Sequence, residues 1–206
     1  GPGIVELNAD EYFKPVKLPS RHQSINPGSY GETTKPLPIA FKDSMKLAVS
    51  VFPTRLTDHF QTILSWGPLR ITLDDKGYVS LYCDDVKFIT SKEPIISAKW
   101  YIIKIEISKD QKTVLSIRDN LTGKEEQTLT ENPKRGIDFD GFKNAKIRVA
   151  TNQSKTEFFN GKIEAPEIKV DGKTILKYDF SQQIPLFEVP AEIGPPLMLS
   201  NSPTRA

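Results

Sequence analysis

The chain has 206 residues, enough for one domain with a sizeable core and two tails, or for two small domains. Its 28 basic and 26 acidic residues leave a net charge of +2, which gives no argument for binding nucleic acid or an anionic membrane surface. The sequence contains no run of 18 apolar residues, the length that a transmembrane helix needs. Its single cysteine excludes an intramolecular disulfide and a zinc site built from several cysteines.

The first 40 residues show little periodic pattern. Prolines from Pro15 to Pro38 break any helix, so we expect residues 1–40 to form an extended arm on the domain, anchored by Tyr12, Phe13 and Ile25. The start, Gly1-Pro2-Gly3, has neither a basic region nor an apolar run and does not resemble a signal peptide. Together with the absence of disulfides, this predicts a cytoplasmic protein.

Short segments of alternating apolar and polar residues, separated by turn signals, begin near Met45. The clearest is Trp100–Ser108, in which Tyr101, Ile103, Ile105 and Ile107 share one face. About ten such segments without a helical period predict an all-β, antiparallel two-sheet sandwich. The expected strands are 45–52, 61–66, 69–73, 78–83, 86–89, 100–108, 113–119, 127–129, 145–150, 158–169 and 174–180.

The stretch from Phe158 to Lys169 reads as a strand that contains a break. Asn160-Gly161 allows a turn or a close backbone approach, and Pro166 cannot donate to a ladder, so the strand lies at an edge or bends there. Asp171-Gly172 predicts a hairpin to the next strand. The periodic pattern ends at Phe180. We therefore expect a sandwich domain at 41–180 and a proline-rich linker or docking arm at 181–206.

No catalytic constellation is visible. His22 and His59 lie in expected loops, and Cys83 at the end of an apolar strand is expected to be a buried structural thiol. The carboxylate pair of a glycosidase could be formed from Glu106, Glu164 and Glu167. Their positions are explained more simply by the alternation of outward-facing polar residues along strands. The segment is thus expected to be non-catalytic by itself.

Four residues are candidates for ligand binding: Trp66, Asp84, Asp85 and Asn160. Trp66 lies beside the Gly67-Pro68 turn and is expected to be more open than Trp100, which we assign to the core. Paired acids in loops can bind calcium, although no calcium-loop spacing supports this for Asp84-Asp85 and a solvated turn is the simpler interpretation. Turn geometry also explains Asn160 more simply than a ligand contact.

The strand pattern resembles the concanavalin A-like, laminin-G-like jelly-roll sandwich, in which a late strand reads as Phe159-Asn160-Gly161-Lys162-Ile163-Glu164 does here. The order of segments is similar to the sandwich segment of the N,N-dimethylformamidase large-subunit family. The segments that carry this likeness are 21–23, 27–30, 52–54, 63–66, 159–166, 178–181 and 201–206.

The second resemblance implies an accessory module without the active site, packed on the catalytic region of its parent chain or on other subunits. In that family an iron site and amide hydrolysis belong to the catalytic region, whose ligands have no counterpart here. The alternative is a carbohydrate-binding, lectin-like module, and a stand-alone glycoside hydrolase ranks below both. The expected partners are therefore protein or glycan, and neither nucleic acid nor a membrane.

Overall fold

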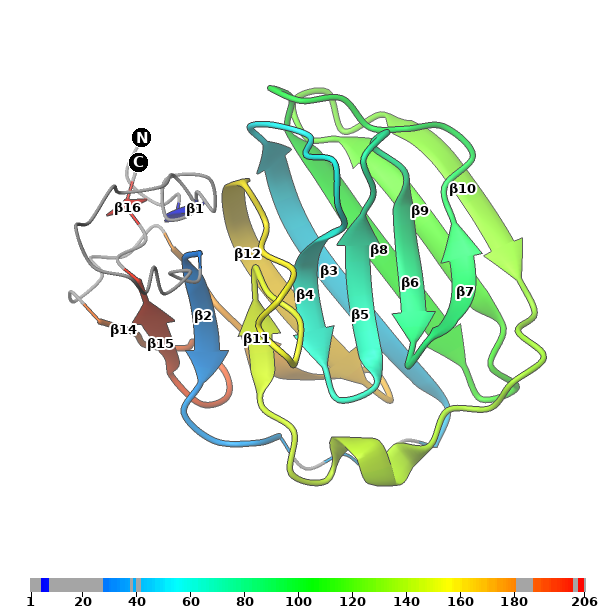
Figure 1. The fold of residues 1–206 in the computed structure, drawn as a ribbon. Helices are drawn as coiled ribbons and strands as arrows, with labels where there is room; N and C mark the ends of the chain where they lie inside the picture. Colours follow the sequence, from blue (N-terminus) through cyan, green and yellow to red (C-terminus); the bar gives the residue numbers. More distant parts are fainter. Residues whose placement is uncertain are drawn as a thin grey trace, which may run out of the picture.

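Two antiparallel sheets pack face to face around one hydrophobic core (Figure 1). The computed structural model describes residues 28–37, 39, 42–180 and 187–201, and the backbone of β1 (Val5–Leu7) and β16 (Thr204–Arg205). In this part of the chain the only helix is the short 3-10 helix η1 (Phe139–Phe142). The prediction of an all-β, two-sheet sandwich is confirmed.

Sheet A has the strand order β10-β9-β8-β3-β12-β1-β16, with β13 paired to β12, and all its pairs are antiparallel. In Figure 1 most of this sheet lies behind the other one. Its remaining strands are β3 (Ser44–Pro53), β8 (Tyr101–Ser108), β9 (Thr113–Asp119), β10 (Glu125–Glu131), β12 (Gly161–Val170) and β13 (Lys173–Lys177).

Sheet B has the order β14-β15-β2-β11-β4-β5-β6-β7 and is also antiparallel. In Figure 1 its central strands lie in front, and β2, β15 and β14 extend it to the left. Its strands are β2 (Tyr30–Thr33), β4 (Gln61–Trp66), β5 (Leu69–Leu73), β6 (Val79–Cys83), β7 (Val86–Thr90), β11 (Ile147–Val149), β14 (Glu188–Val189) and β15 (Leu197–Ser200).

The two-residue period of the strands decides which side chains enter the core. Along β8, Ile103, Ile105 and Ile107 are at most 1% exposed, whereas Lys104 between them is exposed. The inward face predicted for this strand is therefore confirmed, because one face of sheet A packs on sheet B and the other meets solvent.

Strand β12 runs through the interior of sheet A, between β3 and β1, although it contains Pro166. The pairing with β3 shifts register between Glu164 and Glu167, and Ala165 has φ 50°. This bulge takes the proline out of the ladder. Two alternatives were predicted from Pro166. The prediction that the strand bends there is confirmed, and the prediction that it lies at the edge of the sheet is wrong.

Gly161, at the start of the same strand, is required by a close approach. A Cβ at this position would lie 2.3 Å from the carbonyl oxygen of Phe52 on β3. The close approach predicted from Asn160-Gly161 is therefore observed at Gly161, where the backbones of β12 and β3 pair.

Segments expected to be arms supply strands to the sandwich. β2 comes from residues 1–40, while β14 and β15 come from residues 181–206, and all three pair within sheet B. Leu197 is 0% exposed. The sandwich thus extends beyond the expected limits of 41 and 180. Other expectations for the first segment, including Tyr12, Phe13, Ile25 and His22, concern residues outside the described part.

Within the described residues, no helix is long and apolar enough to cross a membrane.

Candidate functional site

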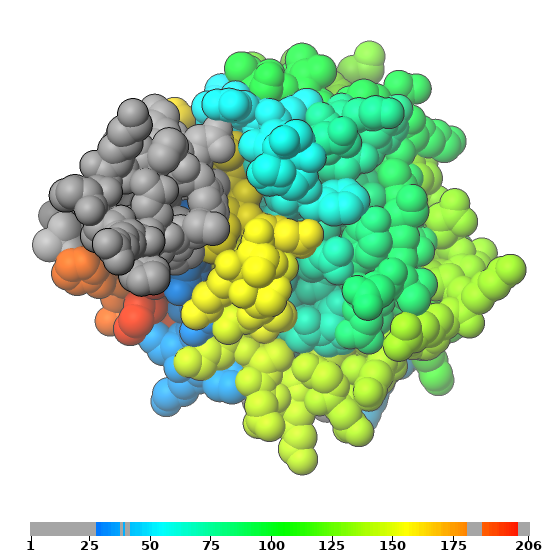
Figure 2. All heavy atoms as spheres, in the orientation of Figure 1, coloured from blue at the N-terminus to red at the C-terminus, as the bar shows by residue number. Residues whose placement is uncertain are grey.

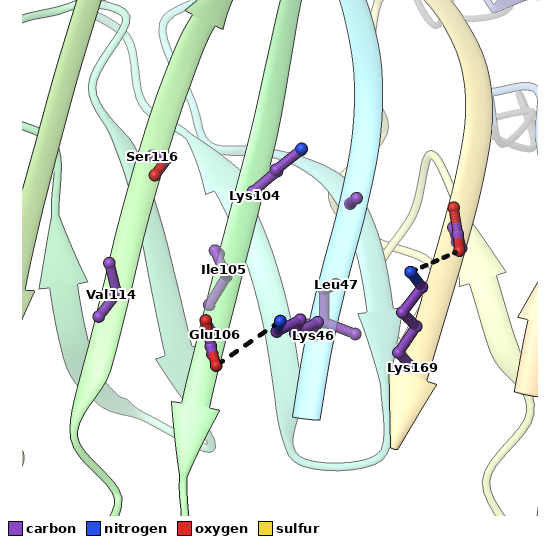
Figure 3. A pocket seen from close by; sticks show the side chains of 10 residues that line it. Lys46, Leu47, Lys104, Ile105, Glu106, Val114, Ser116 and Lys169 are labelled. Atoms are coloured by element: carbon purple, nitrogen blue, oxygen red, sulfur yellow. Dashed lines mark ion pairs between the residues drawn. The ribbon is translucent and has the colours of Figure 1, made fainter. Parts of the chain in front are cut away.

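The outward face of sheet A carries a hollow of about 290 Å³, which we call the sheet A groove (Figure 3). Its floor lies along β3, where the side chain of Ala48 is small and leaves space between the longer side chains of β8 and β12. The residues that line it are Lys46, Leu47, Ala48, Lys104, Ile105, Glu106, Val114, Ser116, Glu167 and Lys169.

Charged side chains flank the groove on both sides. The Nζ atom of Lys46 lies 3.9 Å from Glu106, and Lys169 lies 3.7 Å from Glu167 (dashed lines in Figure 3). These pairs are partly exposed and contribute little to stability. Lys104 also lines the groove, is exposed, and interacts electrostatically with Glu125 on β10.

An aromatic pair lies on the same face of sheet A, further along β3. The rings of Phe52 and Trp100 are 5.5 Å apart at an angle of 46°, and Lys162 lies 5.6 Å from the Phe52 ring centre. Phe52 and Trp100 are both partly exposed. Phe52 lies four residues from Ala48 on one strand, so alternation puts both side chains on the outward face.

The two tryptophans have the opposite environments to those expected. Trp66 is 1% exposed and packs edge-on against Phe142, with ring centres 5.0 Å apart, whereas Trp100 is partly exposed. All six residues of β4 are buried, and Phe142 of η1 packs against the Trp66 ring. The expectation that Trp66 is open is wrong, so this ring cannot offer a surface for stacking.

Asn160 is also buried, at 2% exposure. Its backbone N–H donates to Oε1 of Gln61 at 2.7 Å, and its carbonyl accepts from the N–H of Thr54 at 3.0 Å. These bonds tie the start of β12 to the neighbouring loop. Asn160 is therefore not placed to meet a ligand from solution.

Asp84 and Asp85 lie at a second hollow, of about 370 Å³, on the outward face of sheet B; we call it the sheet B hollow. Its walls are the turns after β4 and β6 and the loop 151–158, which is yellow in Figures 1 and 2. Asp84 pairs with Arg135 at 3.5 Å. The residues that line it are Ser65, Gly67, Pro68, Leu69, Arg70, Asp84, Asp85, Asn152, Gln153, Ser154 and Glu157.

Among the described residues no group of three or more His, Cys, Asp or Glu side chains could hold a metal ion. His59 is exposed and lies 2.8 Å from Asp58. Burial, and secondarily Asp84, raise the pKa of the Cys83 thiol to about 11, which disfavours the reactive thiolate.

Several residues on the two outward faces were not singled out from the sequence. Phe52 packs against Trp100, Lys104 lies opposite Ala48 in the groove, and Glu157 reaches Arg70 from a loop far along the chain. Outward alternation marks Phe52 and Lys104 as surface residues, but no local pattern links Arg70 to Glu157.

No family model matches the chain, and no curated protein matches its sequence. Among solved structures it is similar to the heptameric SAP-like pentraxin from Limulus polyphemus, with a TM-score of 0.56 and 12% identity over 81% of this chain and 75% of that one.

Two further structures are similar at lower TM-scores. The LG1-3 region of the laminin alpha2 chain has a TM-score of 0.49 and 18% identity, over 71% of this chain and 31% of that one. The CBM40 of Ruminococcus gnavus IT-sialidase, bound to alpha2,3 sialyllactose, has a TM-score of 0.45 and 14% identity, over 64% of this chain and 78% of that one.

The pentraxin likeness, together with the two observed sheets, establishes the fold: a concanavalin A-like jelly-roll sandwich, as the resemblance implied. At 12% identity it carries no functional residue over to this chain. Nothing in these comparisons links the chain to N,N-dimethylformamidase.

Proposed function

We propose that this chain is a non-catalytic, lectin-like module that binds an extended saccharide along the sheet A groove. The observation that carries the proposal is the Phe52–Trp100 pair, which is partly exposed on the face that bears the groove. Ligand sites combine apolar or aromatic surface with a few placed polar groups, and the groove offers both.

The dimensions suit a short stretch of polymer. From Phe52 to Ala48 the strand covers four residues, or about 13 Å at about 3.3 Å per residue. A sugar ring can stack its apolar face on Trp100 while its neighbours donate to Glu106 or accept from Lys104. The charges of both signs that line the groove match hydroxyl groups, since a hydroxyl both donates and accepts.

The test is binding of the purified chain to a panel of soluble oligosaccharides, measured by calorimetry for the wild type and Trp100→Ala. Loss of the stacking surface is expected to weaken binding about tenfold or more, equivalent to about 1.4 kcal/mol. Phe187→Ala is the matched control, because Phe187 is an aromatic residue with 68% exposure flanking sheet B. Unchanged affinity in Trp100→Ala, or no binding to any glycan, would reject the proposal.

A second candidate is the accessory role in an N,N-dimethylformamidase-like amidohydrolase, in which the chain packs on a catalytic region. One observation favours docking: Phe187, Ile193 and Met198 are large apolar side chains with 68%, 41% and 49% exposure near the C-terminal strands. The natural reading frame discriminates the two candidates. A continuation that encodes an iron-binding region would favour the accessory role, and its absence would remove that candidate.

A further inference from the structure

Arg70 and Glu157 form an ion pair at the sheet B hollow. The Nε atom of Arg70 donates to Oε1 of Glu157 at 3.2 Å, and the two side chains are only 22% and 20% exposed. Both residues line the hollow. They come from strand β5 and from the loop 151–158, so the fold brings them together at a distance of 87 residues along the chain.

Neighbouring groups fix both side chains in place. The guanidinium of Arg70 lies 4.4 Å from the centre of the Tyr82 ring, and its NH1 group donates to the carbonyl oxygen of Asp84 at 3.0 Å. The hydroxyl of Thr62 donates to Oε1 of Glu157 at 2.9 Å. A ligand would therefore meet a pair that is already ordered, which lowers the entropy cost of binding.

The wall that carries Glu157 is also tied down. Phe159 N–H donates to the carbonyl of Ala150 at 3.0 Å, which closes the loop at its base. Inside the loop, Oδ1 of Asn152 accepts from the N–H groups of Thr156 at 2.8 Å and Glu157 at 3.0 Å. Glu157 is thus held by its backbone as well as by its carboxylate.

The ion pair leaves the NH2 group of Arg70 and one carboxylate oxygen of Glu157 unused. Within the described chain, the NH2 group of Arg70 and Oε2 of Glu157 form no hydrogen bond, because all bonds of the pair use Nε, NH1 and Oε1. A guanidinium offers donors only and a carboxylate acceptors only. Since the two charges compensate each other, the pair does not favour a strong anion or cation.

We propose that the sheet B hollow binds one saccharide unit through two adjacent hydroxyl groups, one accepting from NH2 of Arg70 and the other donating to Oε2 of Glu157. Adjacent hydroxyls are a chemical match for a donor beside an acceptor. A hollow of about 370 Å³ is at the small end of ligand sites, as suits a single sugar unit. This site is separate from the sheet A groove and does not depend on it.

The experiment titrates the full chain with a panel of methyl glycosides, up to tens of millimolar, and follows backbone amide signals by NMR. We expect shifts at the residues that line the hollow, such as Ser65, Arg70 and Gln153. In Glu157→Gln the amide oxygen can keep the bonds to Thr62 and Arg70 while an NH2 group replaces Oε2. Affinity should fall by about tenfold, because a hydrogen bond to a charged oxygen is exchanged for a weaker one from a neutral amide.

Asp75→Asn is the matched control, because Asp75 is an exposed acid that does not line the hollow. It should retain wild-type affinity. Unshifted hollow amides with every glycoside, or full affinity in Glu157→Gln, would overturn the proposal. Arg70→Lys checks it from the donor side and should also weaken binding, because lysine cannot reproduce the planar fork.

The proposals for the two saccharide sites can be rejected independently of each other. Trp100→Ala should leave the titration of the hollow unchanged, and Glu157→Gln should leave oligosaccharide binding at the groove unchanged. Shifts confined to the residues of the groove would reject the hollow as a site while leaving the proposed function in place.

Discussion

The carboxylate of Asp171 holds the start of β3 to the turn between β12 and β13. Its Oδ1 accepts from the N–H groups of Asp43 at 2.7 Å and Ser44 at 3.1 Å, and its Oδ2 accepts from that of Lys42 at 3.0 Å. The N–H groups of Asp43 and then Ser44 lower the pKa of this carboxyl below its ordinary value of 3.8. The ionised form is therefore favoured by folding.

This gives a pH-dependent prediction for Asp171→Asn. A pKa that is lower in the folded state contributes stability above the ordinary value of 3.8, and this contribution disappears as the pH falls through the folded-state pKa. Urea midpoints should show the variant less stable than wild type at pH 7, with the difference shrinking below pH 4. Asp75→Asn, in an exposed turn, is the control. A difference that stays constant with pH would contradict the linkage.

At the level of single residues, the sequence predicted which loop side chains lie at the surface better than which distant side chains contact each other. Asp84 and Asp85 are on the surface as expected, because they occupy the turn between two strands. The burial of Trp66 was not predicted, because the Phe142 ring that packs against it comes from a distant part of the chain. The pairing of Arg70 with Glu157 depends on a loop returning from 87 residues away, and local patterns hold no information about such a contact.

At the level of elements, the central strands were predictable and the outer ones were not. β4 and β5 have the predicted bounds, because each combines apolar inward residues with a clear turn. β2, β14 and β15 have between two and four residues, too few for a period to be recognised. They exist because neighbouring strands of sheet B offer hydrogen bonds, a tertiary effect.

The place of β15 in the sandwich predicts the effect of Leu197→Ala. Leu197 is 0% exposed, whereas its neighbour Met198 is 49% exposed. Removing the buried side chain should cost about 2–5 kcal/mol, from lost burial and a cavity. Met198→Ala should change stability by about 0.5 kcal/mol or less. Chemical denaturation measures both, and equal small effects would show that the strand is a docked arm instead of part of the core.

At the scale of the whole molecule, the two hollows lie on the outward faces of opposite sheets, separated by the core. One small ligand therefore cannot contact both hollows. Two polysaccharide chains, in contrast, could bind one protein molecule from opposite sides. The main core couples both faces to the same folding equilibrium, since its residues come from both sheets.

Cys83 can report whether the sandwich opens as one unit. Its side chain is 1% exposed in β6, between β5 and β7, and burial raises its pKa to about 11. A thiol reagent at pH 8 should therefore label the native protein slowly, through opened molecules.

If opening is global, a variant should be labelled faster in proportion to the stability it loses, about tenfold for each 1.4 kcal/mol. Leu197→Ala, three strands beyond β4 in sheet B, should then accelerate labelling strongly, and Met198→Ala should not. Labelling that is fast in the wild type, or unaffected by Leu197→Ala, would mean that β5, β6 and β7 open independently of the far end of the sheet. The sheet B hollow would in that case lie between two units of different stability, because Arg70 comes from β5 and Glu157 from the loop after β11.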